Sequence, residues 1–106
     1  MNTAKILHDA SLDMVIEANK AKAKGDNDLY EQFLQKAFAL EKEAALKVQF
    51  DKNDEFWRFV LIRSAAWLAF NCGKYEDAIA LIKFGRSGNP PSSVLIEFEE
   101  LEEKLS

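Results

Sequence analysis

Glycine and proline are few in this chain of 106 residues, and their positions divide it into long segments that lack a helix breaker. They occur only at Gly25, Gly73, Gly85, Gly88 and the adjacent pair Pro90 and Pro91. Because these two residue types are the least compatible with a helix interior, the long stretches between them predict long helices joined by short turns. The sequence offers no strand pattern of any weight, so we expect an all-α fold.

Apolar residues recur at spacings of three and four within each segment, which is the pattern of an amphipathic helix. It predicts five antiparallel helices over about residues 3–24, 28–49, 54–72, 75–86 and 91–105. In the third helix the apolar residues surround nearly the whole axis, which is typical of the central helix of a domain. Asp26–Asp28 and Asp51–Asp54 provide capping side chains for the helices that follow them.

The same patterns assign individual side chains to the solvent or to the core. In the second helix we expect a solvated side, formed by Glu41, Lys42, Glu43 and Lys47. In the fourth helix we expect an inward side, formed by Tyr75, Ala78, Ile79, Leu81 and Ile82. In the last helix a narrow apolar stripe of Leu95, Phe98, Leu101 and Leu105 opposes a run of glutamates.

Charge and hydropathy exclude two classes of partner. The formal net charge is −4, and no clustered basic face is present to displace counterions from phosphates, so we expect no nucleic-acid partner. The most apolar run, residues 56–70, is interrupted by Arg58 and Arg63 and is shorter than the ~20 residues that span a bilayer. We therefore expect no membrane partner, and a single cysteine makes the cytoplasm the expected compartment.

Catalytic and metal sites are not indicated. His8 is the only histidine, and sequence spacing gives it no second group of the kind that a nucleophile–base pair requires. We interpret it as a half-exposed helical histidine. Cys72 lies at a helix end, where the negative end of the dipole raises a thiol pKa, and we interpret it as a small buried residue. We expect no enzyme activity, no cofactor and no metal.

Residues 59–91 resemble one tetratricopeptide repeat. The first helix has a small residue, Ala66, and the turn after it has the pattern Gly-x-Tyr-x-x-Ala, formed by Gly73, Tyr75 and Ala78. The second helix has a bulky residue, Ile82, followed by a small one, Gly85, and Pro90 closes the repeat. Ile62 stands where the family has an aromatic residue, and Ala66 where it has glycine. Arg63–Trp67 together with Ser87–Pro91 also resembles an uncharacterised group of small bacterial proteins of this type.

The first two predicted helices resemble the family more loosely, through Ala18, Gly25, Tyr30 and Ala37. The interval from Gly25 to Gly73 exceeds the family's period of about 34 residues. The resemblance implies one domain over residues 1–106, with a first hairpin over about 3–49 and a second over about 54–86. It also implies a capping helix over about 91–105 and a right-handed α–α superhelix. The acidic outer face of the last helix suits such a cap.

In tetratricopeptide repeats the first helix of each pair lines a concave groove that takes peptides. The resemblance therefore implies a groove side on the third helix, formed by Val60, Arg63, Trp67, Phe70 and Asn71. Arginine and tryptophan are among the residue types that contribute most to binding energy. The implied function is a non-catalytic protein–protein interaction module, or scaffold, whose partner is an unidentified protein or peptide.

Two alternatives remain open. One is a structural homodimer without a separate ligand, in which the apolar third helix is buried between subunits. In that case Trp67 and Phe70 are covered by a second copy of the chain, or by the first helix. The other is a small-ligand carrier or an enzyme accessory with a pocket between helices. The sequence does not identify the partner, the process or the oligomeric state.

Overall fold

The computed structural model describes residues 3–48 and 55–106, which form five helices and, within these ranges, no strand. The helices are α1 (Thr3–Ala23), α2 (Asn27–Val48), α3 (Glu55–Asn71), α4 (Tyr75–Arg86) and α5 (Ser92–Leu105). The all-α prediction is confirmed, and the predicted bounds differ from these by one residue at most. The predicted caps at 51–54 lie outside the described residues.

Two glycines end helices as the sequence predicts. Gly25 and Gly73 have φ angles of 80° and 75° and so adopt the left-handed conformation that glycine tolerates best. After α1, the amide of Asp26 donates to the carbonyl of Ala21, and after α3 that of Lys74 donates to Ala69. These are the closing bonds of Schellman motifs. The Asp26 carboxylate then accepts a bond from the Leu29 amide at 3.0 Å, which caps α2.

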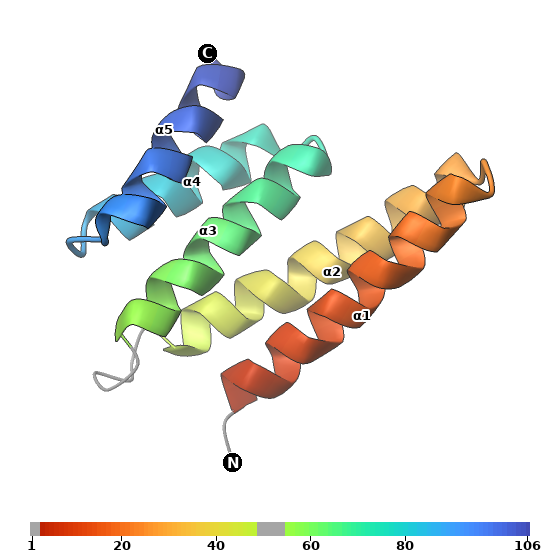
Figure 1. Ribbon diagram of the computed structural model, residues 1–106, viewed down its shortest axis with the longest axis horizontal. Coiled ribbons are helices and arrows are strands. Elements are labelled where there is room, and N and C mark those ends of the chain that lie inside the picture. Colours follow the sequence, from red (N-terminus) through yellow and green to blue (C-terminus); the bar gives the residue numbers. More distant parts are fainter. Residues whose placement is uncertain (1–2, 49–54) are drawn as a thin grey trace.

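The helices lie in two layers. Figure 1 shows α1, α3 and α5 in the nearer layer and α2 and α4 behind them. α1 packs along α2, α2 also packs against α3, and α3 packs against both α4 and α5. The distal ends of α1 and α2, near Gly25, project away from the other three helices (Figure 1). Among the described residues, no helix combines the length and the apolar character needed to cross a membrane.

The core centres on α3, which packs against α2, α4 and α5. Its fully buried members are large and small apolar residues, namely Phe59, Leu61, Ile62, Ala65, Ala66 and Ala69. α4 and α5 contribute Ile82, Val94, Phe98 and Leu101 to the same cluster. The prediction that the third helix is central is therefore confirmed, although one side of it stays accessible.

Three sequence-based assignments to core or solvent are wrong. Glu41 was expected among solvated residues, yet its side chain is only 1% exposed because α2 is covered by α1 on one side and by α3 on another. Tyr75 and Ile79 were expected to face inward, but both are exposed. Tyr75 begins α4, before its inward stripe, and its ring lies outside the core against Phe70. The buried stripe of α4 passes through Ala78, Leu81, Ile82 and Gly85 instead.

Candidate functional site

The five residues predicted to line a groove lie on the least buried side of α3. Val60, Arg63, Trp67 and Phe70 are half-buried and Asn71 is exposed. Their spacing along the helix places them on one face, because residues three, four and seven positions apart share a side. The structure therefore brings these five side chains together, and the binding role remains a prediction.

Neighbouring groups hold part of this stripe in place. The Arg63 guanidinium donates from Nη1 to the Glu97 carboxylate of α5 at 2.8 Å. The Phe70 ring lies edge-on to the Trp67 ring, with centroids 6.4 Å apart, and is tilted against the Tyr75 ring at 5.6 Å. Arg63 is thus already neutralised within the chain, and the aromatic rings are restrained by one another before any partner arrives.

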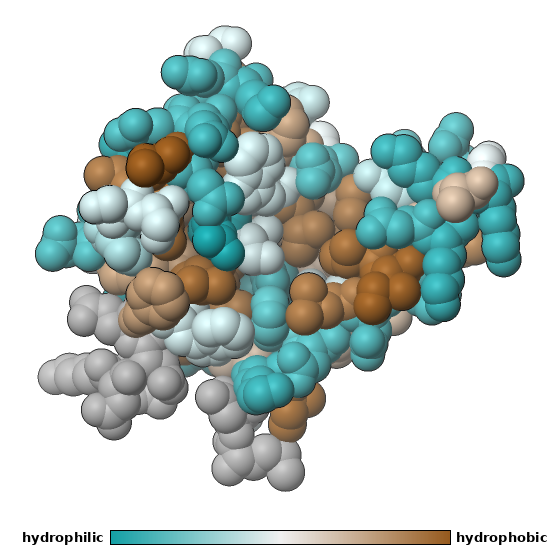
Figure 2. All heavy atoms as spheres, viewed as in Figure 1, coloured by the Kyte–Doolittle hydropathy of each residue, from teal (hydrophilic) through white to brown (hydrophobic). Residues whose placement is uncertain are grey.

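α1 adds two apolar side chains that the sequence analysis did not assign to the site. Leu12 and Ile16 are 46% and 51% exposed. They follow His8, which meets Trp57 of α3, at intervals of four residues, and helix geometry turns them by about 40° and 80° around α1 from that contact. Figure 2 shows hydrophobic side chains gathered over the middle of α1 and between it and α3. We call Leu12, Ile16, Val60, Trp67 and Asn71 the front face.

A sequence signal for these two residues existed. The predicted stripe of α1 contains Leu7, Met14 and Ala18, and Leu12 and Ile16 fall outside it on what is otherwise a charged side. A second apolar pair at a four-residue spacing, away from the main stripe, indicates an apolar surface that the helix does not bury on its main partner.

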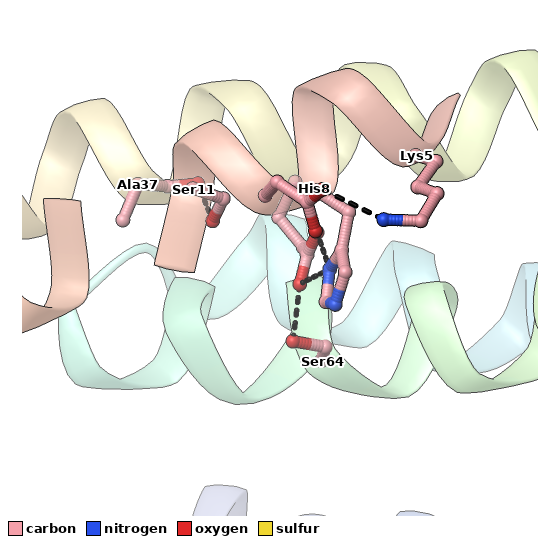
Figure 3. Close-up of polar contacts among 7 residues, drawn as sticks. Lys5, His8, Ser11, Ala37 and Ser64 are labelled. Atoms are coloured by element: carbon pink, nitrogen blue, oxygen red, sulfur yellow. Dashed lines mark hydrogen bonds and ion pairs between the residues drawn. The ribbon is translucent and has the colours of Figure 1, made fainter. Parts of the chain in front are cut away.

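A buried polar cluster lies where α1, α2 and α3 meet. The Glu41 carboxylate of α2 accepts a bond from Nδ1 of His8 on α1, with its two oxygens 2.7 and 3.0 Å away. The same carboxylate accepts a bond from the Ser64 hydroxyl of α3 at 2.6 Å. Figure 3 shows His8 and Ser64 on either side of this carboxylate. The His8 ring also lies edge-on to Trp57, with centroids 5.1 Å apart.

The sequence analysis missed this cluster because its members come from three different helices. Sequence spacing indicated no partner for His8, and the structure shows that Glu41 pairs with it from 33 positions away. The order of contacts differs from that of a catalytic triad, in which the histidine bonds to the serine. Here the Ser64 hydroxyl donates to the carboxylate, so the imidazole is not placed to take its proton. Among the described residues, no group of three His, Cys, Asp or Glu side chains could hold a metal ion.

Cys72 is half-buried at the end of α3, and burial raises the pKa of its thiol, while the nearby Lys74 ammonium opposes this in part. The direction predicted from sequence is confirmed, although burial rather than the helix end is the main cause. The pKa is higher in the folded chain than in the unfolded one. The thiol therefore stabilises the fold below its unfolded pKa, and this contribution is lost as the pH rises through the folded value.

We expect Cys72 to be alkylated by iodoacetamide more slowly in the folded chain than in the urea-unfolded chain at neutral pH. The thiolate is the reacting species, and a raised pKa lowers its fraction. Mass spectrometry over a pH series measures both rates, and the gap should narrow as the pH becomes alkaline. Equal rates at neutral pH would contradict the assignment of a half-buried thiol with a raised pKa.

Comparison with known proteins yields no assignment: no family model, no curated protein and no solved structure matches the chain.

Proposed function

We propose that the chain is a non-catalytic interaction module that binds an apolar segment of a partner protein or peptide on its front face. The observation that carries this proposal is the exposure of Leu12 and Ile16 on α1, together with the partial exposure of Trp67 on α3. Exposed apolar side chains on one helix and partly exposed ones on another form the kind of surface that marks interaction sites.

We further propose that the module is of tetratricopeptide type and acts in the cytoplasm. In this arrangement α1–α2 and α3–α4 are successive antiparallel hairpins of a right-handed superhelix, and α5 is the cap. Three observations support it: the two layers of helices, the Schellman turns at Gly25 and Gly73, and the packing of each helix on its neighbour. The front face then belongs to the first helices of the hairpins, which is where this family binds peptides.

The charges around the front face favour an apolar ligand over a charged one. Arg63 is paired with Glu97 on α5, and Lys5 is paired with Asp9 on α1 at 2.9 Å. Exposed pairs of this kind contribute little binding energy when a new charge approaches, because each charge is already compensated and hydrated. Trp67 supplies an aromatic anchor and Asn71 an amide that can bond to a peptide backbone.

The test is a selection of peptides from a random library on the immobilised chain, followed by affinity measurements on variants. Trp67→Ala is expected to weaken binding by about 2 kcal/mol or more, the usual scale of a hot-spot residue. Ile16→Ala should also weaken it. Ile79→Ala is the matched control, because Ile79 is also exposed, at 41%, but belongs to α4 in the other layer.

The outcomes separate this proposal from its alternatives. Selected peptides that bind all three variants with the affinity of the original chain contradict it. If no peptide is selected, light scattering across a dilution series decides whether the front face is occupied by a second copy. A dimer that Ile16→Ala dissociates and Ile79→Ala does not would replace the proposed function with self-association through the same face.

A further inference from the structure

The helices α1 and α2 are joined to the other three helices through few directional contacts. α1 packs extensively against α2. Over the described residues, α1 makes no contact of comparable extent with α3, α4 or α5. The cluster around Glu41 is one polar contact that joins α1 and α2 to the rest of the described chain. Another is the ion pair between Lys42 of α2 and Asp77 of α4, whose atoms are 3.4 Å apart.

The Lys42–Asp77 ion pair and the Glu41 cluster differ in strength. The side chains of Lys42 and Asp77 are 42% and 41% exposed, and ion pairs this accessible to water contribute little. The Glu41 carboxylate is almost completely buried and accepts bonds from two helices at once. Hydrogen bonds to a buried charge are short and strongly directional, and they constrain the positions of all their members.

The apolar contacts beside the cluster constrain orientation less. The buried residues that follow Glu41 on α2 are Ala44, Ala45 and Val48, and Ala65 adjoins Ser64 on α3. Burial of such side chains stabilises the packing, but the hydrophobic effect has no direction of its own. A polar contact with fixed geometry therefore adds a directional restraint to this apolar packing.

We propose that His8, Glu41 and Ser64 form a latch that fixes the orientation of α1 and α2 relative to α3. The carboxylate joins one residue from each of the three helices, and the contact of the His8 ring with Trp57 adds a second point on α3. Loss of these hydrogen bonds changes the separation of α1 and α3, and this changes the width of the front face. The latch itself is independent of whether that face binds a partner.

The test measures the distance between spin labels on α1 and α3, at Asn19→Cys and Asn71→Cys, in a chain that also carries Cys72→Ala. Glu41→Leu removes every acceptor at the centre of the cluster. Because the substitution leaves His8 and Ser64 without their acceptor, it is expected to lower stability, and circular dichroism first verifies that the variant folds. It should lose the single narrow distance peak of the parent. Glu41→Gln should keep that peak, because its amide can accept from His8 and donate to Ser64.

Two controls distinguish loss of the latch from a nonspecific loss of helix packing. Lys42→Met, which removes only the exposed pair, should leave the distribution narrow. A label pair at Asn19→Cys and Glu31→Cys, within α1 and α2, should stay narrow in every variant. The proposal is overturned by a Glu41→Leu distribution as narrow as that of the parent, or by equal broadening in Lys42→Met. If Glu41→Leu does not fold, Ser64→Ala decides in its place: broadening supports the latch, and an unchanged peak overturns it.

Discussion

Replacing Phe59 with alanine is expected to destabilise the chain by about 3–5 kcal/mol, which is the usual cost of deleting a buried aromatic ring. Phe59 is 1% exposed and is among the largest fully buried side chains of the central helix. Its ring also lies 5.0 Å from the Arg58 guanidinium, and it would come within 3.0 Å of a side chain at Gly88. The ring thus supports both the core and the connection between α4 and α5.

The same helix provides a matched control for this variant. Phe56 lies one turn earlier on α3 and is 64% exposed. Phe56→Ala should change the free energy of unfolding by no more than about 0.5 kcal/mol, as surface substitutions usually do. Urea titration of both variants, with equal slopes, measures the difference. Similar losses for the two would contradict the assignment of Phe59 to the core and of Phe56 to the surface.

Gly85→Ala is expected to destabilise the chain by about 1–3 kcal/mol through overpacking, although alanine suits a helix better than glycine does. A Cβ at this position would lie 2.6 Å from the Phe98 ring of α5 and 3.1 Å from Ile62 of α3. Both of these side chains are fully buried, so neither has free space into which it can move. Glycine at 85 therefore permits α4 to approach α3 and α5 closely.

A double-mutant cycle with Phe98→Leu tests the cause. The smaller side chain at 98 should relieve the contact, so the two losses should fall short of additivity by about 0.5–3 kcal/mol, as is usual for residues in contact. Gly73→Ala is the control, because it is strained by its φ of 75° while its Cβ would meet open space. Phe98→Leu should not rescue it. Strict additivity for Gly85 and Phe98 would contradict the close approach.

Local signals predicted the helices and their ends well. The scarcity of glycine and proline, the apolar periodicity and the capping residues all act within a few positions, so Gly25, Asp26 and Gly73 could be assigned from sequence. The side of α3 that stays partly accessible was indicated by the resemblance to a tetratricopeptide repeat, which implied a stripe through Val60, Arg63 and Trp67.

The placement of Glu41 could not be predicted, because it depends on which helices cover α2. A glutamate within a charged segment is usually solvated, and only the meeting of α1 and α3 above it explains its burial. Leu12 and Ile16 carry a local signal as a second apolar pair on α1, but the helix that lies nearest to them is set by tertiary packing. The exposure of Tyr75 and Ile79 was missed because apolar periodicity gives the orientation of a short helix only approximately.

The most direct test of the proposed function uses the two tryptophans, Trp57 and Trp67, whose indole N–H groups give two separate signals in an NMR spectrum of the isotope-labelled chain. The ligand is the tightest peptide from the library selection. The account predicts that the Trp67 signal shifts on addition of the peptide, together with the amides of Leu12 and Ile16. A hollow of about 250 Å³ lies between α4 and α5, where Ile79, Ile82 and Leu105 help to line it. An unchanged Trp67 signal, with shifts of the amide signals of these three residues instead, would contradict the account.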